Sequence, residues 1–357
     1  MLVKLQSKNK KVALGMSGGV DSSVAAFLLK EAGYDVHGFY MTCWDSKADG
    51  CRADEDRVDA LKVATSLNIP FKALDFQNEY RERVIGYFYS EYEDGRTPNP
   101  DVMCNKEIKF GLFFDYAMNE GFDFISTGHY SRVSHEGNCF RLLMGIDESK
   151  DQSYFLYRLN QDILSKTLFP VGGFPKSKIR EIANTQNLYT KSKPDSMGIC
   201  FIGEVDIKEF LLKKLPINPG NVVDKEGRII GSHDGVWFYT IGQRHGFKLS
   251  KYFGVPLYVI SKNVSKNELV VGFIKDTQVS NFKVSQLNFI CDKNLPSEER
   301  TYNFRIRHLG KFYPGKIKFS SNDSISISLD YPAFGVASGQ SCVIYENNNV
   351  VGGGIIS

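Results

Sequence analysis

Lys11-Val-Ala-Leu-Gly-Met-Ser-Gly-Gly-Val-Asp-Ser22 is the stretch of sequence that decides the fold. Its first half is an apolar run typical of a buried strand, and residues 21–31 carry the apolar spacing of a helix. Between them, two glycines let backbone N–H groups crowd around an anion, and the start of the helix adds its positive end. The stretch therefore predicts a phosphate-binding loop between a strand and a helix. It is not a Walker A loop, because no Lys-Ser/Thr follows a second glycine.

Strand-like and helix-like stretches alternate through the first part of the chain, which predicts a doubly wound parallel sheet of the α/β class. The expected strands cover 11–16, 35–41, 71–75 and 124–127, and the expected helices cover 21–31, 54–67, 80–92 and 110–120.

After about residue 204 the pattern changes to one short helix, at 206–215, followed by short β-rich runs broken by Gly, Asn and Pro. These runs predict two small antiparallel β-barrels. The expected domains are therefore 1–205, 206–275 and 276–357. The β-rich runs cover 228–230, 236–239, 257–260, 268–271, 302–307, 315–319, 324–329 and 341–345.

The charge of the chain is unevenly divided. Residues 206–357 hold 19 Lys+Arg and 13 Asp+Glu, a net of +6, which leaves the first 205 residues with 25 and 28, a net of −3. A basic β-rich part favours a polyanionic partner. No apolar run approaches the ~20 residues of a membrane span, and the polar N-terminus lacks the apolar core of a signal peptide. We therefore expect a cytoplasmic protein without a membrane partner, and a monomer.

The seven cysteines are widely and irregularly spaced, and no Cys-x-x-Cys pair occurs. This argues against a secreted disulfide framework and against a zinc ribbon, so we expect free thiols and no structural metal. Free cysteines are usually small buried hydrophobes, which is the ordinary expectation for each of them.

Two cysteines lie in motifs that suggest more. In Thr97-Pro-Asn-Pro-Asp-Val-Met-Cys-Asn-Lys-Glu-Ile-Lys-Phe110, two prolines fix a turn, and Asp101, Cys104 and Lys106 follow at the mouth of a helix. A helix N-terminus and a nearby lysine would lower the pKa of the Cys104 thiol. The alternative is a structural loop with a packed cysteine. Lys193-Pro-Asp-Ser-Met-Gly-Ile-Cys-Phe-Ile-Gly203 contains Cys200, which on its own is typical of a core residue.

The stretch from Gly15 to Ser22 resembles the PP-loop of the ATP pyrophosphatase superfamily. That resemblance implies ATP cleavage between the α- and β-phosphates and transfer of AMP to an oxygen. It also implies Mg²⁺ as a cofactor, with Asp21 helping to hold the metal near the phosphates.

The order of motifs resembles the tRNA 2-thiouridylase family (MnmA/TrmU) along nearly the whole chain. The matching segments also include 49–56, 126–130, 150–157, 168–172, 240–244, 338–341 and 352–356. The chain departs from the family at His308 and His245, where relatives commonly have a tyrosine and a lysine.

The resemblance implies an ATP-dependent tRNA-uridine 2-sulfurtransferase that adenylates the wobble uridine and then transfers sulfur from a cysteine persulfide. Cys104 would be the nucleophile, Cys200 the persulfide carrier and Asp101 an acid/base. The partners would be tRNA and a cysteine desulfurase or sulfur-relay protein. The predicted ATP contacts are Gly15, Met16, Ser17, Gly18, Gly19, Val20, Asp21, Ser22, Met41 and Gly128. Asn99, Pro100 and Asp101 would meet the target base, and His129, Lys150, Asp151, Gln152, Arg307, His308 and Gln340 would contact tRNA.

The scheme requires the fold to bring Cys104 and Cys200 together, although 96 positions separate them. The persulfide either attacks the activated carbon directly or is freed by Cys104 as hydrosulfide, after which a disulfide closes. Three other readings remain open. One is a PP-loop amide ligase that needs no tRNA, a second is an iron–sulfur tRNA thiolase, and a third is a non-catalytic RNA-binding paralogue.

Overall fold

A computed structural model of the chain describes residues 9–44, 53–195, 198, 200–203, 206–251, 254–291, 296–321 and 323–357. Residues 49–52 of one family-like segment lie outside the described residues, as do 196, 197 and 199 of the second cysteine motif and 204–205 at the first expected domain boundary.

The N-terminal part is built on a parallel five-stranded sheet of order β3-β2-β1-β4-β7. Its strands are β1 (Lys11–Gly15), β2 (Asp35–Thr42), β3 (Phe71–Asp75), β4 (Phe124–Ser126) and β7 (Thr167–Leu168). Because β1 is central, its carboxyl end lies where the strand order reverses. In sheets of this kind ligands bind at that position.

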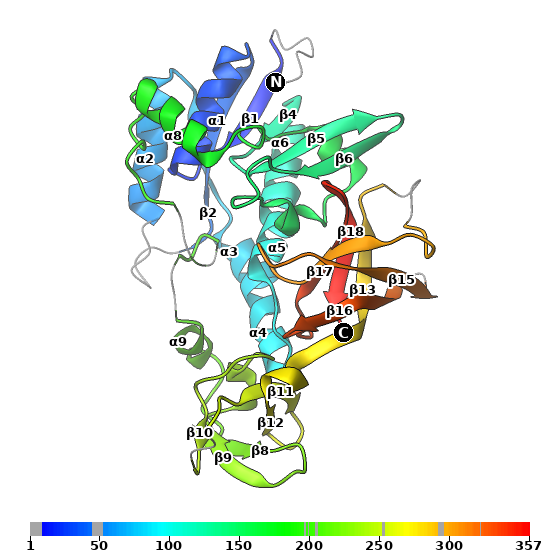
Figure 1. The fold of residues 1–357 in the computed structure, drawn as a ribbon. Helices are drawn as coiled ribbons and strands as arrows, with labels where there is room; N and C mark the ends of the chain where they lie inside the picture. Colours follow the sequence, from blue (N-terminus) through cyan, green and yellow to red (C-terminus); the bar gives the residue numbers. More distant parts are fainter. Residues whose placement is uncertain are drawn as a thin grey trace.

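Helices cover both faces of this sheet (Figure 1). On one side lie α1 (Val20–Glu31), α2 (Ala53–Ser66) and α8 (Lys176–Thr185), and α6 (Phe113–Asn119) lies on the other. Val12 and Leu14 pack into the core that holds α1 and α8, whereas Ala13 between them packs with Phe113. Alternate residues of β1 thus face opposite helix layers, and the predicted doubly wound α/β fold is confirmed.

Two long helical segments follow the third strand. The first joins α3 (Gln77–Tyr80), the π-helical η1 (Arg81–Ile85) and α4 (Gly86–Glu93), and the second joins α5 (Pro100–Cys104), the π-helical η2 (Asn105–Leu112) and α6. The helix predicted from residue 110 therefore begins at Pro100. Asn99 caps it by accepting a hydrogen bond from Val102 N at 3.2 Å, and Pro100 occupies the first turn, where its missing N–H costs nothing.

The C-terminal part is a closed antiparallel barrel, because β13 pairs with both β16 and β18. Its strands are β13 (Gln278–Phe289), β14 (Tyr302–Arg305), β15 (Tyr313–Ser321), β16 (Ser324–Phe334), β17 (Ser341–Glu346) and β18 (Asn349–Ile356). Its interior is apolar and includes the fully buried Phe304, Ile325 and Ile344. The barrel predicted for the end of the chain is confirmed.

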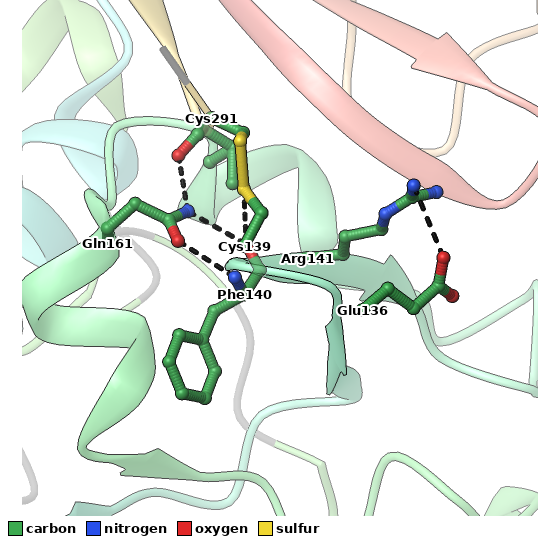
Figure 2. The surroundings of a disulfide bond; sticks show 7 residues. Glu136, Cys139, Phe140, Arg141, Gln161 and Cys291 are labelled. Carbon is green, nitrogen blue, oxygen red and sulfur yellow. Dashed lines mark hydrogen bonds and ion pairs between the residues drawn. A yellow bond between two sulfur atoms is a disulfide. The ribbon is translucent and has the colours of Figure 1, made fainter. Parts of the chain in front are cut away.

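A hairpin from the first part of the chain extends this barrel's sheet. β6 (Cys139–Met144) pairs with β18, and β5 (Ser131–Glu136) pairs with β6. A disulfide between Cys139 and Cys291, with Cα atoms 6.2 Å apart, joins this hairpin to the end of β13 (Figure 2). Free thiols remain at Cys43, Cys104, Cys200 and Cys342 among the described cysteines. Since 152 positions separate Cys139 from Cys291, their spacing gave no sign of the pairing.

The middle part is a sheet of order β10-β9-β8-β12-β11, placed at the lower end of the molecule in Figure 1. Its strands pair antiparallel except for β8 and β12, which run parallel. This pair differs from the antiparallel arrangement expected for the middle part. The run 236–239, predicted as a strand, instead contains the 3-10 helix η4 (Val236–Phe238). The sheet's strands are β8 (Gly220–Val223), β9 (Ile229–His233), β10 (Lys248–Leu249), β11 (Tyr258–Asn263) and β12 (Glu268–Gly272).

The remaining helices are η3 (Ser153–Leu156), α7 (Gln161–Ser165), α9 (Ile207–Leu212) and η5 (Ile274–Thr277). No helix within the described ranges has both the length and the apolar character needed to cross a membrane.

Candidate active site

The predicted phosphate loop lies between the carboxyl end of β1 and the first turn of α1. Ser22 Oγ holds the loop closed, because it accepts from Ser17 N at 3.2 Å and donates to Gly19 O at 3.1 Å. Gly18 has a φ of 72°, and a Cβ there would lie 2.1 Å from the carbonyl oxygen of Asp56. Only glycine fits this position, since it needs both positive φ and close backbone contact.

The loop offers backbone donors that suit an anion such as a phosphate group. The N-cap of α1 is Gly19, which has no side chain to bond the N–H groups of the helix's first turn. These groups and the helix dipole favour an anion. Gly128, after β4, faces the same turn, because a Cβ there would lie 2.8 Å from Ser22 N. The side chains of Met16, Val20 and Met41 are buried in the core, so contact with a nucleotide would come from their backbone.

Asp21 has partners that the sequence did not indicate. Lys176 Nζ, from α8, donates to both carboxylate oxygens of Asp21 at 2.7 and 2.9 Å, and Tyr130 Oη donates to Oδ1 at 2.7 Å. Lys176 also reaches Asp195 at 2.8 Å. A chain of ion pairs therefore runs from the phosphate loop to a residue five positions before Cys200.

Asp195 is the most heavily paired carboxylate of this chain of contacts. Besides Lys176 it binds Lys150 at 2.7 Å and Arg180 at 2.6 Å. Partial burial opposes ionisation of Asp195, but the hydrogen bonds and charges of Lys150 and Lys176 hold its pKa below the ordinary value. Lys150, expected to contact tRNA, thus has a partner within the protein.

Cys104 and Cys200 lie together, as the scheme required. Cys104 Sγ donates to Cys200 Sγ at 3.4 Å. Cys104 is fully buried, whereas Cys200 is partly exposed. Two contacts fix the Cys200 backbone: its N–H donates to Asp101 Oδ1 at 2.9 Å, and its carbonyl accepts from Tyr80 Oη at 2.6 Å.

The expected lowering of the Cys104 pKa is wrong. Burial raises the pKa of Cys104, and the hydrogen bond to Cys200 raises it further. The reason is that α5 starts four residues earlier, so Cys104 lies inside a continuous helix rather than at its mouth. The pKa of Cys200 is lowered instead, first by the hydrogen bond from Cys104 and then, against burial, by the charge of Lys109.

The lysine that acts on the sulfurs is therefore Lys109 and not Lys106. Lys106 is exposed and pairs with Glu107 at 2.8 Å. Asp101, beside Cys200, has its pKa raised by burial, partly offset by the N–H of Cys200 and by the charge of Lys109.

A pocket of about 610 Å³ is lined by Asp101, which accepts from Cys200 N, and by Gly198 and Gly203, which flank Cys200 in the chain. It brings the residues expected to meet the target base next to the segment that carries Cys200. The Pro98 turn on its wall is fixed by the C-terminal barrel, because Gln340 Nε2 donates to Thr97 O at 3.0 Å and Pro98 O at 3.1 Å. The lining residues are Phe88, Tyr92, Thr97, Pro98, Asn99, Pro100, Asp101, Gly198, Gly203, Asp206, Ile207 and Gln340.

Asp151 has no exposed surface with which to meet tRNA. Its carboxylate accepts from Gly145 N, Ser153 N, Ser153 Oγ and Arg305 Nη1, at 2.9–3.1 Å. The tRNA contact expected of this side chain therefore has no atom to make it. Asp151 instead joins the N-terminal part to β14 of the barrel.

The other residues expected to contact tRNA differ in exposure. His129 is 7% exposed, and Gln152 Oε1 accepts from Tyr130 N at 2.9 Å. Arg307 is exposed, and its guanidinium donates to Gly335 O at 2.9 Å. His308 packs on the ring of Phe155 at 4.2 Å between centroids, and burial lowers its pKa to about 4.

Sequence reasoning missed Lys109, Lys176 and Asp195. Lys109 lies in the motif of Cys104 and Asp195 lies in the motif of Cys200. The sequence could have indicated them only as charged residues five positions from a cysteine. Lys176 is the first residue of α8, a helix that the sequence pattern did not predict. Among the described residues, no group of three or more His, Cys, Asp or Glu side chains is placed to hold a metal ion.

A glycine-rich loop lies at the switch point of a parallel sheet, and ion pairs of Lys176 link it to the segment that carries Cys200. This arrangement defines an α/β protein with an anion-binding loop and a thiol centre. Three family models match the chain: the tRNA methyl transferase HUP domain over residues 10–204, the tRNA methyl transferase PRC-barrel domain over 208–273, and the aminomethyltransferase beta-barrel domain over 279–356.

The curated relatives match over nearly the full length. The chain is 43% identical to the tRNA-specific 2-thiouridylase MnmA of Bacillus velezensis, covering 98% of this chain and 95% of the relative. It is 45% identical to that of Enterococcus faecalis, covering 97% and 95%. The chain belongs to the tRNA-specific 2-thiouridylase family. Among solved structures, the U34-tRNA thiolase NcsA from Methanococcus maripaludis with its 4Fe-4S cluster matches at 23% identity and a TM-score of 0.37, covering 59% of this chain and 68% of that one.

Proposed function

We propose that the chain is an ATP-dependent tRNA-uridine 2-sulfurtransferase that converts the wobble uridine of tRNA to 2-thiouridine. The observation that carries the proposal is the 3.4 Å approach of Cys104 Sγ to Cys200 Sγ. Asp101, which accepts from Cys200 N at 2.9 Å, also lines the pocket formed with Asn99 and Pro100. A family relationship supplies the reaction class, and this geometry supplies the two sulfurs that the reaction needs.

In the first step the uridine O2 attacks the α-phosphorus of ATP, the α–β bond breaks and pyrophosphate leaves. The loop from Gly15 to Ser22, with Gly128, would hold the nucleotide through backbone N–H groups. Asp21 would hold Mg²⁺, which offsets phosphate charge when bound. Lys176 pairs with Asp21 and would turn to the phosphates when ATP is bound.

In the second step sulfur replaces the O2–AMP group. The outer sulfur of a Cys200 persulfide attacks carbon 2 and AMP leaves with the oxygen. Cys104 then attacks Cys200 Sγ, the bond to the outer sulfur breaks, and a Cys104–Cys200 disulfide forms. Alternatively, Cys104 attacks first and frees hydrosulfide, which then attacks carbon 2. Both routes end in the same disulfide, which external thiols reduce.

The substrate base must leave its stack to enter the pocket. A wobble uridine lies in a single-stranded loop, where splaying a base out has a modest cost. The aromatic side chains of Phe88 and Tyr92 line the same pocket as Asn99. Exposed cations of the basic part of the chain, residues 206–357, would contact phosphate, Arg307 among them, and such contacts weaken as salt is added.

The sulfur donor is a cysteine desulfurase or sulfur-relay protein that presents a persulfide to Cys200. A cytoplasmic location, a monomeric state and the division at 205 and 275 remain predictions of the same proposal.

The decisive experiment replaces each cysteine and separates the two steps. We expect Cys200→Ser to abolish 2-thiouridine formation while tRNA-dependent release of pyrophosphate continues; retained thiolation would exclude the scheme. Cys342→Ser, at a buried thiol in the barrel core, is the control and should leave both steps intact.

The competing readings have their own signatures. ATP–pyrophosphate exchange without tRNA would favour an amide ligase. Visible absorbance after anaerobic purification would favour an iron–sulfur thiolase. Unchanged 2-thiouridine in tRNA from cells lacking the chain would favour a non-catalytic paralogue.

A further inference from the structure

We propose that Lys109 is a catalytic residue of the cysteine pair: its ammonium holds Cys200 as the thiolate that accepts sulfur and stabilises the anionic sulfur released when Cys104 closes onto Cys200. The inference rests on the proposed function and adds to it a residue that touches the reacting sulfurs.

The helix geometry brings Lys109 to the face that carries Cys104. The two residues are five positions apart, and η2 has the i→i+5 hydrogen bonds of a π-helix. In an α-helix of 3.6 residues per turn, positions five apart differ by about 140° and point to different sides. A π-helical turn contains more residues, so positions five apart lie nearer to the same side. Cys104 directly precedes η2, and this rare local structure brings Lys109 toward the side of the helix that carries Cys104.

The ammonium of Lys109 faces a small set of groups. It is hydrogen-bonded to Cys200 and is close enough to Cys104 and Asp101 for their charges to act on it. Its Nζ also lies 5.8 Å from the ring centroid of Phe201, the residue after Cys200. Its Nζ lies 3.4 Å from His129 Nε2. Burial alone would lower the pKa of Lys109, but the charges of Cys200 and Cys104 raise it above the ordinary value, so the side chain is a cation at neutral pH.

His129 accepts from this cation without competing for its charge. Lysine can only donate, so Nε2 must be the acceptor, and Nδ1 then donates to Thr127 Oγ1 at 2.7 Å. Burial, with the charge of Lys109, holds the pKa of His129 well below its ordinary value. His129 is thus a neutral group that orients Lys109.

Two further titratable groups near the sulfurs, Cys43 and Tyr80, favour their neutral forms. Burial raises the pKa of Cys43 and of Tyr80, and the charge of nearby cysteine sulfur adds to both shifts. Asp101 is the other group that can carry negative charge beside Cys200, and burial raises its pKa. Lys109 is therefore the cation that can balance a sulfur anion in this enclosed site.

The chemistry creates such an anion twice. In loading, the Cys200 thiolate attacks the outer sulfur of the donor's persulfide, and the donor cysteine leaves as thiolate. In closure, the Cys104 thiol attacks Cys200 Sγ, a Cys104–Cys200 bond forms, and the electron pair of the broken bond leaves on the outer sulfur, which takes up the proton that Cys104 gives up. An unpaired charge in a buried site is costly, so a fixed cation beside Cys200 favours both steps.

The test measures the pH dependence of Cys200 alkylation by iodoacetamide, read by mass spectrometry of the Cys200 peptide, in the protein without ATP or tRNA. Cys104 does not compete, because its side chain is fully buried. We expect the wild-type midpoint to lie below the ordinary cysteine value of about 8.5. We expect Lys109→Met and Lys109→Gln to raise it by one pH unit or more and to slow alkylation at pH 7 about tenfold.

Lys106→Met is the matched control, because Lys106 lies three residues away on the same helix but is exposed and paired with Glu107. Its profile should match the wild type, and Lys109→Arg, which keeps the charge, should stay near it. A wild-type midpoint at or above 8.5 overturns the proposal whatever the variants do. So do neutral Lys109 variants that follow the wild-type profile, or a Lys106→Met shift of equal size.

If both neutral variants lose their cooperative unfolding transition, the Lys109→Arg profile decides, and a midpoint as high as that of free cysteine overturns the proposal. The outcome is separable from the proposed function. If the Lys109 variants shift the alkylation midpoint as expected but the wild type makes no 2-thiouridine, only the proposed sulfurtransferase activity is excluded. If Lys109→Met leaves both thiolation and alkylation unchanged, only the role of Lys109 is excluded.

Discussion

Asp151→Asn should strongly destabilise the contact between the C-terminal barrel and the rest of the chain. The Asp151 side chain is 0% exposed and that of Arg305 is 6% exposed, with 2.9 Å between Asp151 Oδ2 and Arg305 Nη1. Neutralising the carboxylate leaves the arginine charge buried and uncompensated, which costs about 3–5 kcal/mol. The hydrogen bonds from Gly145 and Ser153 to the carboxylate weaken at the same time.

Hydrogen exchange of the barrel amides, read by mass spectrometry, measures this loss locally. A cost of about 3–5 kcal/mol corresponds to exchange that is faster by a hundredfold to a few thousandfold for amides that exchange through the lost contact. The matched control is Glu136→Gln, whose partner Arg141 lies at 3.2 Å with side chains 58% and 36% exposed. Such exposed pairs contribute about 0–1 kcal/mol.

Two results would refute the reasoning. One is an Asp151→Asn effect no larger than that of Glu136→Gln. The other is unchanged exchange together with a tenfold loss of tRNA affinity, which would return Asp151 to the role of a tRNA contact.

Two further predictions concern the nucleotide and the barrel. Gly128→Ala should lower ATP affinity at least tenfold in calorimetry with the fold retained, because the added Cβ would lie 2.8 Å from Ser22 N. Gly173→Ala is the control and should bind ATP normally, because a Cβ there meets nothing within 4 Å. Equal ATP affinities of the two variants would contradict the assignment of the loop. His308 has a pKa lowered to about 4 by burial, so between about pH 6.5 and 4 the unfolded chain binds a proton that the folded chain does not. Stability should therefore fall as the pH falls through this window, by at most roughly 3 kcal/mol. His308→Tyr should remove that part of the acid sensitivity in urea denaturation, and an unchanged pH dependence would show that His308 does not titrate this way.

Local pattern was enough to find the elements that carry the nucleotide. The apolar run before Ser17 and the helical spacing after Asp21 depend only on near neighbours, so strand, loop and helix could be predicted together. The strands of the barrel were found for the same reason. Local pattern failed at 236–239, where an apolar run of strand composition forms a 3-10 helix.

The sulfur centre depended on two kinds of information. The motifs around Cys104 and Cys200 predicted that both cysteines take part, and the structure places them at 3.4 Å. Which cysteine has the lowered pKa could not be predicted, because that depends on burial and on the π-helical register that turns Lys109 toward Cys200. Spacing along the chain pointed to Lys106 instead.

The sequence by itself determined the fold class, the phosphate loop and the two cysteine motifs, because each is written in residues that are close together along the chain. Only the tertiary structure decided that Asp151 is buried with Arg305, that Cys139 is bonded to Cys291, and that Lys176 joins the phosphate loop to the Cys200 segment. These pairs are far apart in sequence. The charge and burial of each side chain arise only when the sheet, its helices and the barrel pack together.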